Sequence, residues 1–158
     1  MSNIQIIVAD RAGVRIYEAR SGDPELHVLD EIANTALGRH ERDLVASRAG
    51  RRRNPATRQP QELAPRSRAR DNAVGAFARA IARRSSTRAR LRGHDALILV
   101  AEPRMLGEIR SRLSKASLAR LASQVAKDLT HVDAAVLARR LRPALLEAQW
   151  LCETGTPR

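Results

Sequence analysis

ALILVA, at residues 96–101, decides the fold, because six apolar residues follow one another without a polar interruption. A strand with water on one face alternates apolar and polar residues, so an unbroken apolar run indicates a central strand covered on both faces. Glu102 and Pro103 follow directly, and proline is favoured at the first positions of a helix, where its missing N–H costs no hydrogen bond. The run therefore predicts a buried strand that leads straight into a helix.

Upstream of this strand, the chain predicts an antiparallel meander. Short apolar or alternating segments predict strands at residues 4–10, 14–19 and 26–32. Asp10 and Gly13 occupy the first and fourth positions of a turn between the first two strands. In the second strand we expect Val14 and Ile16 to face inward, with Tyr17 and Glu18 facing outward.

Helical periodicity governs most of the remaining chain. One apolar stripe predicts a helix over residues 69–92; its members are Val74, Phe77, Ala78, Ile81 and Ala82. Residues 118–126 fit a helix or a strand, and we favour a strand for the second half. The last helix is expected over residues 133–151, with Thr130 and Asp133 at capping-box spacing before it.

The order β-β-β-α-β-α-β-α predicts one α/β domain over residues 1–158. A meander followed by helix–strand alternation implies a mixed five-stranded sheet with helices on both faces. This is the layout of ribonuclease-H-like domains. Residues 34–67 lack periodicity and are predicted to form a long basic loop, which is typical of functional or disordered segments.

The net charge of +12 is concentrated in one segment. Residues 39–92 hold sixteen arginines against four acidic residues, whereas the remaining basic and acidic residues balance. Clustered arginines bind phosphates bidentately and release counterions from a nucleic-acid backbone. The predicted RNA-binding residues are Arg48, Arg51, Arg52, Arg53, Arg58, Arg66, Arg68 and Arg70. Only three aromatic residues are present, so the segment favours recognition of the backbone or shape of structured RNA over base stacking.

Composition argues against several other classes of protein. Cys152 is the single cysteine, so neither an internal disulfide nor a Cys/His metal cluster is expected. His27, His40 and His94 lack metal-binding spacing, and no cofactor motif is present. No apolar run reaches the ~18–20 residues of a membrane span, and no secretion signal is recognised, which predicts a cytoplasmic protein. Trp150 is expected to pack in the last helix or to contact a second copy in a homodimer.

Five segments resemble, in the same order, a bacterial family of host attachment proteins, described as required for attachment to host cells. The segments are residues 8–18 (VADRAGVRIYE), 41–45 (ERDLV), 99–107 (LVAEPRMLG), 113–116 (LSKA) and 127–131 (KDLTH). KDLTH is the most specific of them, and its polar residues are Lys127, Asp128, Thr130 and His131.

The family is similar to the middle domain of archaeo-eukaryotic release factors and of Pelota, which implies a ribonuclease-H-like fold and a link to ribosomes. Release factors hydrolyse peptidyl-tRNA through a Gly-Gly-Gln loop. This chain has no such tripeptide, and residues 51–60 read RRRNPATRQP instead, so that activity is not implied. The resemblance favours a non-enzymatic RNA- or ribosome-associated domain. An adaptor that binds an acidic protein partner through the same arginines is the alternative.

A metal-dependent nuclease is a further alternative. Asp10 and Glu102 end two predicted strands, as carboxylates do in two-metal nucleases, but the helix after residue 72 offers no third carboxylate. For the KDLTH residues, either a ligand-facing polar cluster or a helix cap is possible, and the cap is favoured because of the Thr-x-x-Asp spacing.

Overall fold

A computed structural model describes residues 1–37 and 63–155 of the chain. Its strands are β1 (Asn3–Ala9), β2 (Gly13–Arg20), β3 (His27–Ala33), β4 (Ala96–Ala101) and β5 (Leu121–Val125). They form one sheet in the order β3-β2-β1-β4-β5. β1, β2 and β3 pair antiparallel, and β4 and β5 continue the sheet parallel to β1. The predicted mixed five-stranded sheet of one α/β domain is confirmed.

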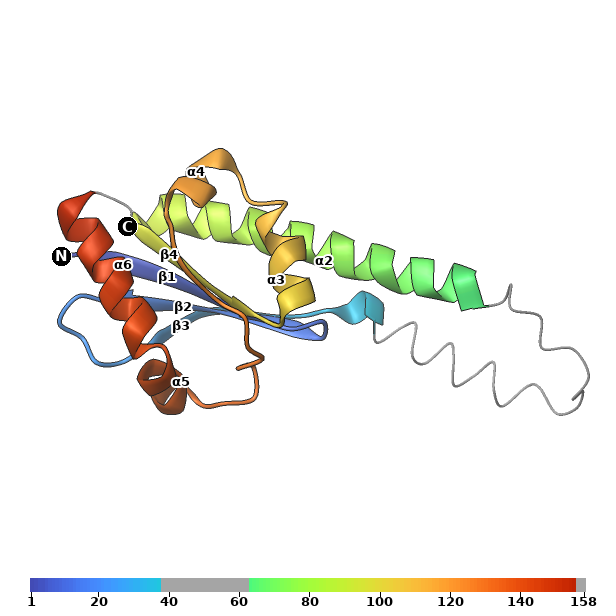
Figure 1. Cartoon of the computed structure of the whole chain (residues 1–158), viewed down its shortest axis with the longest axis horizontal. Coiled ribbons are helices and arrows are strands. Elements are labelled where there is room, and N and C mark those ends of the chain that lie inside the picture. The colour runs from blue at the N-terminus through green and yellow to red at the C-terminus, as the bar shows by residue number, and fades with distance from the viewer. Residues whose placement is uncertain (38–62, 156–158) are drawn as a thin grey trace, which may run out of the picture.

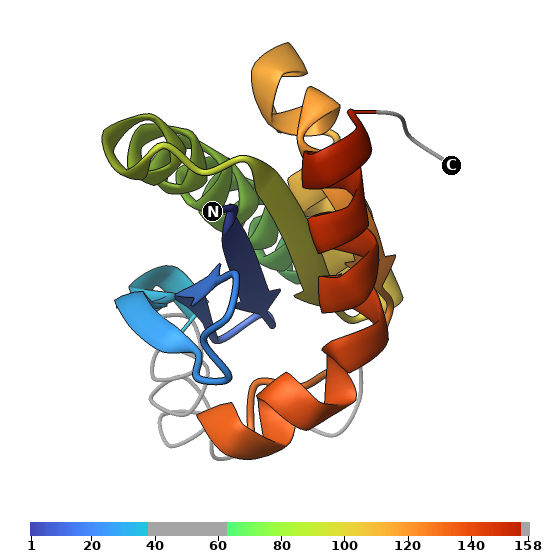
Figure 2. The ribbon, with the colours of Figure 1, turned by 90° about the vertical axis from the view of Figure 1, so that its left-hand side faces the viewer.

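Helices cover both faces of this sheet (Figures 1 and 2). They are α2 (Leu63–Arg92), α3 (Pro103–Arg110), α4 (Lys115–Ala119), α5 (Ala134–Arg140) and α6 (Arg142–Thr154). α2 and α3 pack on one face, over a core that includes Ile7, Ile16 and Leu99. α5 and α6 pack on the other face, over Ile6 and Ile98. Neighbouring strand residues therefore enter opposite cores, as the two-residue period of a strand requires.

The central strand β4 is buried at every position, as its apolar run predicts. It lies between β1 and β5, so both of its edges are hydrogen-bonded as well as both of its faces covered. Pro103 opens α3 immediately after it, also as predicted.

The prediction for Tyr17 and Glu18 is wrong, because both side chains are buried, with exposed fractions of 3% and 1%. The sheet has no solvent-facing side at β2, so the alternation there separates two covered faces. Glu18 accepts hydrogen bonds from Arg20 and lies 3.3 Å from Nε2 of His94. Burial lowers the pKa of His94, and the nearby Glu18 carboxylate opposes this effect only in part.

The predicted loop over residues 34–67 needs correction at both ends. Residues 35–37 are helical, and α2 begins at Leu63, six residues before the predicted start at Ala69. The core of that prediction, residues 38–62, lies outside the described residues. The early start of α2 carries no apolar stripe of its own, so the amphipathic period could not locate it.

Two boundaries in the C-terminal half also differ from the prediction. Residues 118–126 divide between the end of α4 and the strand β5, in the order that was favoured. The single last helix is wrong: α5 ends at Arg140, and α6 starts at Arg142 with Pro143 in its first turn. Proline lacks the N–H that a continuous helix needs and clashes with the preceding turn, so the helix breaks there.

Among residues 1–37 and 63–155, no helix combines the length and the apolar composition that crossing a bilayer requires. The longest, α2, has 30 residues and is rich in arginine.

Candidate functional site

The predicted RNA-binding arginines are only partly within the described structure. Arg48, Arg51, Arg52, Arg53 and Arg58 lie outside the described residues. Arg66, Arg68 and Arg70 belong to α2, and the side chains of Arg68 and Arg70 are exposed. The candidate interface must therefore be built from α2 itself.

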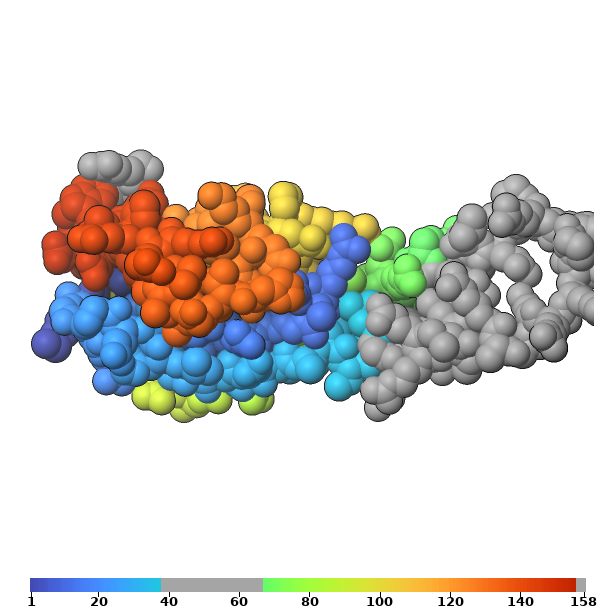
Figure 3. All heavy atoms as spheres, turned by 90° about the horizontal axis from the view of Figure 1, so that it is seen from below, coloured from blue at the N-terminus to red at the C-terminus, as the bar shows by residue number. Residues whose placement is uncertain are grey.

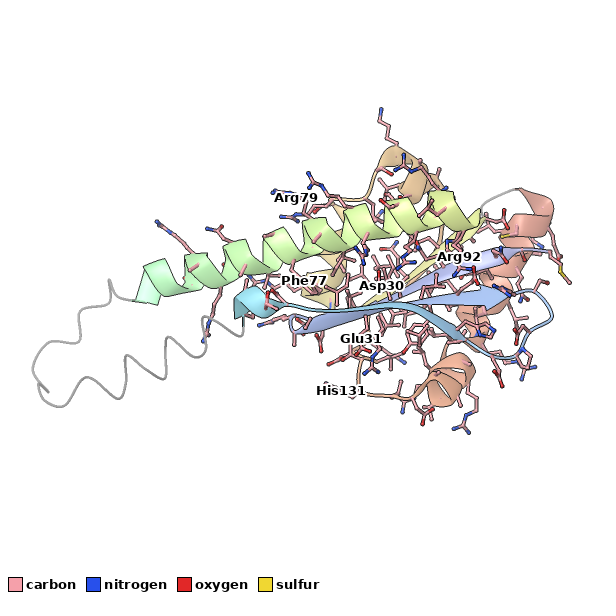
Figure 4. The ribbon with its side chains drawn as sticks, turned by 180° about the vertical axis from the view of Figure 1, so that it is seen from behind. Asp30, Glu31, Phe77, Arg79, Arg92 and His131 are labelled. Carbon is pink, nitrogen blue, oxygen red and sulfur yellow. The ribbon has the colours of Figure 1, made fainter. Side chains whose placement is uncertain are left out.

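α2 presents arginines on the side away from the sheet. At 3.6 residues per turn, Arg68, Arg79, Arg83 and Arg90 fall within roughly 60° of one another around the helix. All four are exposed, and we call them the arginine face of α2. Figure 4 shows Phe77 pointing from α2 toward the sheet and Arg79 pointing away from it. The apolar stripe thus fixes the direction in which these arginines face solvent.

Two other arginines of α2 have a structural role. Arg84 Nε and Arg88 Nη2 donate hydrogen bonds to Asp30 Oδ2 at 2.6 and 3.1 Å. These bonds, chiefly the one from Arg84, lower the pKa of Asp30 despite its partial burial. Asp30 therefore ties the C-terminal half of α2 to the edge strand β3.

Within residues 1–37 and 63–155, no carboxylate neutralises the arginine face. In the parts of the chain that the structure describes, none of its four members forms an ion pair. Asp71 is the single acidic residue of α2, and it pairs with Arg104 of α3. The face is consequently an uncompensated row of guanidinium groups.

A second candidate site lies at the carboxyl end of β1, where the KDLTH segment meets the β1–β2 turn. Thr130 Oγ1 lies 2.9 Å from Oδ2 of Asp10 and 2.6 Å from Oδ1 of Asp128. The Thr130 amide also donates to Asp128 Oδ1, and these two bonds from Thr130 lower the pKa of Asp128. His131 Nε2 lies 3.8 Å from Asp128 Oδ2.

The predicted capping box at Thr130 is wrong. Asp133 is the N-cap of α5, and its Oδ1 accepts a hydrogen bond from the amide of Val136 at 2.8 Å. Thr130 lies three residues earlier, and its hydroxyl lies within hydrogen-bond distance of Asp10 and Asp128 instead of capping the helix. The Lys127 side chain is exposed, and the backbone amide of Lys127 donates a hydrogen bond to the carbonyl of Val125.

The two carboxylates considered for a nuclease have different partners. Asp10 Oδ1 accepts hydrogen bonds from the amides of Ala12 and Gly13, both at 2.7 Å, which holds the β1–β2 turn. Glu102 forms an ion pair with Arg11 at 2.8 Å. Within the described residues, the structure groups Asp10 with Asp128 and His131, and Glu102 is not part of that group.

A shallow cavity of about 240 Å³ adjoins this group. Asp10, Arg15, Glu31, Thr130 and His131 contribute to its wall. In Figure 3 the blue atoms of the β1–β2 turn lie against the orange atoms of the segment before α5. Glu31 and His131 lie on the same side of the sheet, opposite to Asp30 (Figure 4).

Comparison with known proteins places the chain in a family. The model of the family described as "protein required for attachment to host cells" matches residues 5–141. The chain belongs to this family. The matched range of the host-attachment family includes Asp10, the whole of α2 and the KDLTH segment, so both candidate sites lie within it.

No curated protein matches the chain in sequence. Among solved structures, the chain is similar to an archaeal translation termination factor, aRF1, with 16% sequence identity and a TM-score of 0.42. The match covers 97% of this chain and 41% of the archaeal factor, so the chain spans less than half of that protein's length.

Sequence reasoning missed the meeting of Asp10 with the KDLTH segment in this host-attachment domain. The signal was present in part, because Asp10 follows β1 and Asp128 follows β5, and parallel strands end at one edge of a sheet. The spacing of histidines along the chain does not indicate this group, because Asp10 is far from the KDLTH segment in sequence. Asp10 and Thr130 are 120 residues apart.

Proposed function

We propose that this host-attachment domain binds structured RNA, ribosomal RNA among the candidates, without catalysing a reaction. The arginine face of α2 would contact the phosphates, together with the arginine-rich segment that precedes the helix. The observation that carries the proposal is the row of exposed guanidinium groups at Arg68, Arg79, Arg83 and Arg90 that no described carboxylate neutralises.

Guanidinium groups suit phosphate recognition because their planar donors match two phosphate oxygens at once. α2 has 30 residues, which corresponds to about 45 Å of straight helix. In Figure 1 its N-terminal part extends past the end of the sheet. A rigid basic rod of this length can reach several phosphates, which favours an extended polyanion over a single small ligand.

The placement of the aromatic residues favours backbone recognition over base stacking. Tyr17 and Phe77 are buried, with exposed fractions of 3% and 7%. Trp150 is half-buried in α6, which packs on the other face of the sheet from α2. No aromatic ring is therefore available beside the arginine face to stack on an unpaired base. Structured RNA, read through its phosphates and shape, fits this surface better than a single-stranded sequence.

The test compares two triple charge reversals. One variant carries Arg79→Glu, Arg83→Glu and Arg90→Glu on the arginine face. The matched control carries Arg139→Glu, Arg140→Glu and Arg142→Glu, three exposed arginines at the α5–α6 junction over the opposite face of the sheet. Binding of each protein to fragments of structured ribosomal RNA is measured by electrophoretic mobility shift.

We expect the α2 variant to lose at least about tenfold in affinity, because each lost phosphate contact also forfeits counterion release. The control variant should retain the wild-type affinity within a factor of about three, because its arginines lie over the opposite face of the sheet. Both variants change the net charge equally, so a difference between them reports local phosphate contacts. Equal losses in the two variants would mean that net charge alone drives binding. Unchanged affinity in the α2 variant would refute the proposal.

An acidic protein partner could use the same arginines. Its binding would depend on the shape of one protein surface, so an excess of unrelated structured RNA would not displace it. Retention of a lysate protein by the wild-type domain in the presence of such RNA, and its loss with the α2 variant, would favour this adaptor over the RNA-binding function.

A further inference from the structure

Asp10, Asp128 and His131 each direct a potential metal ligand to the same point. One carboxylate oxygen of each aspartate and one imidazole nitrogen of His131 lie within 4.8 Å of one another. The ligands come from the β1–β2 turn and from the segment between β5 and α5, so the fold of the whole sheet brings them together.

The Thr130 hydroxyl has two carboxylate acceptors within hydrogen-bond distance but only one proton to donate. The acceptors are a carboxylate oxygen of Asp10 and one of Asp128. A threonine hydroxyl carries one proton, so it can donate to only one of these oxygens at a time. The other contact places a hydroxyl lone pair against a carboxylate, which is unfavourable unless a cation lies nearby.

Within the described residues, His131 is the one basic side chain at ion-pair distance from Asp10 or Asp128. In a protein with 29 lysines and arginines, neither Asp10 nor Asp128 forms an ion pair with one of them within the described residues. Two arginines close to the group have other carboxylate partners: Arg11 pairs with Glu102, and Arg15 pairs with Glu31 while its Nη1 donates to the carbonyl of Thr130 at 3.4 Å. Two carboxylates left unneutralised in so basic a protein favour an external cation.

We propose that Asp10, Asp128 and His131 bind one divalent first-row transition-metal ion such as Zn²⁺ or Mn²⁺. Carboxylate oxygens alone would suit Mg²⁺ or Ca²⁺, but an imidazole ligand favours the first-row transition metals. The His131 side chain is 83% exposed and can adjust to the metal–ligand distances of about 2.1 Å that such ions require.

The adjoining cavity gives this site room for ligands beyond the protein. Three protein ligands leave at least one coordination position for water or a substrate group, as in open metal sites. The cavity beside Asp10 and His131 is walled in part by Arg15 and Glu31. The site is separate from the arginine face of α2, so its metal binding does not rest on the proposed RNA-binding function.

The test uses Co²⁺ as a spectroscopic probe and Zn²⁺ as its competitor, added to the full chain after treatment with a chelator. Visible absorption of Co²⁺ reports the binding, and displacement by Zn²⁺ gives the affinity of the latter. The variants are His131→Gln and Asp128→Asn; the second keeps the Oδ1 acceptor that Thr130 uses. Asp10 is left intact, because its other oxygen holds the β1–β2 turn.

A second surface pair provides the matched control. Asp23 and His27 are 2.8 Å apart and partly exposed, but no third ligand joins them within the described residues. We expect one equivalent of metal per chain, with affinity at least tenfold weaker in both site variants and unchanged within twofold in His27→Gln. Equal affinity in wild type and His131→Gln, or a loss of the same size in His27→Gln, would overturn the proposal.

Discussion

Asp10 connects the β1–β2 turn to the KDLTH segment. Its Oδ1 accepts two backbone N–H groups of the β1–β2 turn, and its Oδ2 faces the hydroxyl of Thr130. One carboxylate thus joins the end of β1 to the segment that leads into α5. Through this side chain, the β1–β2 turn contacts the KDLTH segment, which lies about 120 residues further along the chain.

Replacing Asp10 by alanine should therefore destabilise the domain. Asp10→Ala leaves the amides of Ala12 and Gly13 without their acceptor and Thr130 without one partner. We expect a loss of about 1.5–3 kcal/mol in the free energy of unfolding, the range for hydrogen bonds to charged groups. Urea denaturation measures this change. Asp10→Asn, which keeps one acceptor oxygen, should lose less; equal losses would contradict the assigned role of Oδ1.

His94 makes stability depend on pH. Burial lowers its pKa in the folded protein below the ordinary value of 6.5, so below that pH the unfolded chain binds the proton more readily. The stability that neutral His94 provides is present above pH 6.5 and is lost as the pH falls toward the folded-state pKa. Thermal unfolding of wild type should show a falling melting temperature from pH 7.5 to pH 5.5.

The variant His94→Gln isolates this contribution. It removes the titrating ring next to the buried Glu18, so its melting temperature should fall less over the same pH interval. Parallel curves for the variant and the wild type would contradict the role assigned to His94.

At the scale of elements, α2 is positioned by an apolar stripe and by a few polar contacts. Ser85 donates its hydroxyl proton to Gln5 Oε1 at 2.6 Å, and Gln5 Nε2 donates to the carbonyl of Ser85 at 3.2 Å. Both side chains are 1% exposed. With the Asp30 contacts of Arg84 and Arg88, this pair fixes the rotation of α2 on the sheet, and so the direction of the arginine face.

Ser85→Ala should therefore cost more than a usual serine substitution. It leaves the buried Gln5 Oε1 without its donor, a defect worth about 1–3 kcal/mol in the free energy of unfolding. Thr87→Ala, two residues along on the exposed side of α2, should change stability by less than about 0.5 kcal/mol. Guanidinium denaturation of both variants measures the difference, and equal effects would contradict the role assigned to the Gln5–Ser85 pair.

Prediction from the sequence succeeded where one element buries a regular pattern. β4 and the apolar stripe of α2 follow from periodicity alone, since burial dictates where the apolar residues must lie. The failures have local physical causes. Thr130 and Asp133 offer the same capping chemistry three residues apart, and only the approach of Asp10 decides which of them caps α5. Glu18 is charged, so its sequence position predicts exposure. It is buried beside His94, which lies 76 positions further along the chain and could not be placed there by local periodicity.

At the scale of the whole molecule, the sheet separates two surfaces with different chemistry. α2 lies on one face with its row of arginines, and α5 and α6 lie on the other (Figure 2). The group formed by Asp10, Asp128, Thr130 and His131 lies at the edge where β1 ends. α2 alone carries nine arginines against one aspartate, so within the described residues the positive charge is concentrated on its side of the sheet. The field of such a charge distribution orients a polyanion toward one face before contact.

The most direct test of RNA binding by α2 is the salt dependence of RNA affinity. The association constant for a structured RNA is measured between 50 and 200 mM salt for wild type and for the variant Arg79→Ala, Arg83→Ala, Arg90→Ala. If these arginines contact phosphates, each one removed should reduce the slope of log K against log salt by about one. A slope lower by about three is the predicted result; a slope equal to that of wild type would contradict RNA binding through the arginine face of α2.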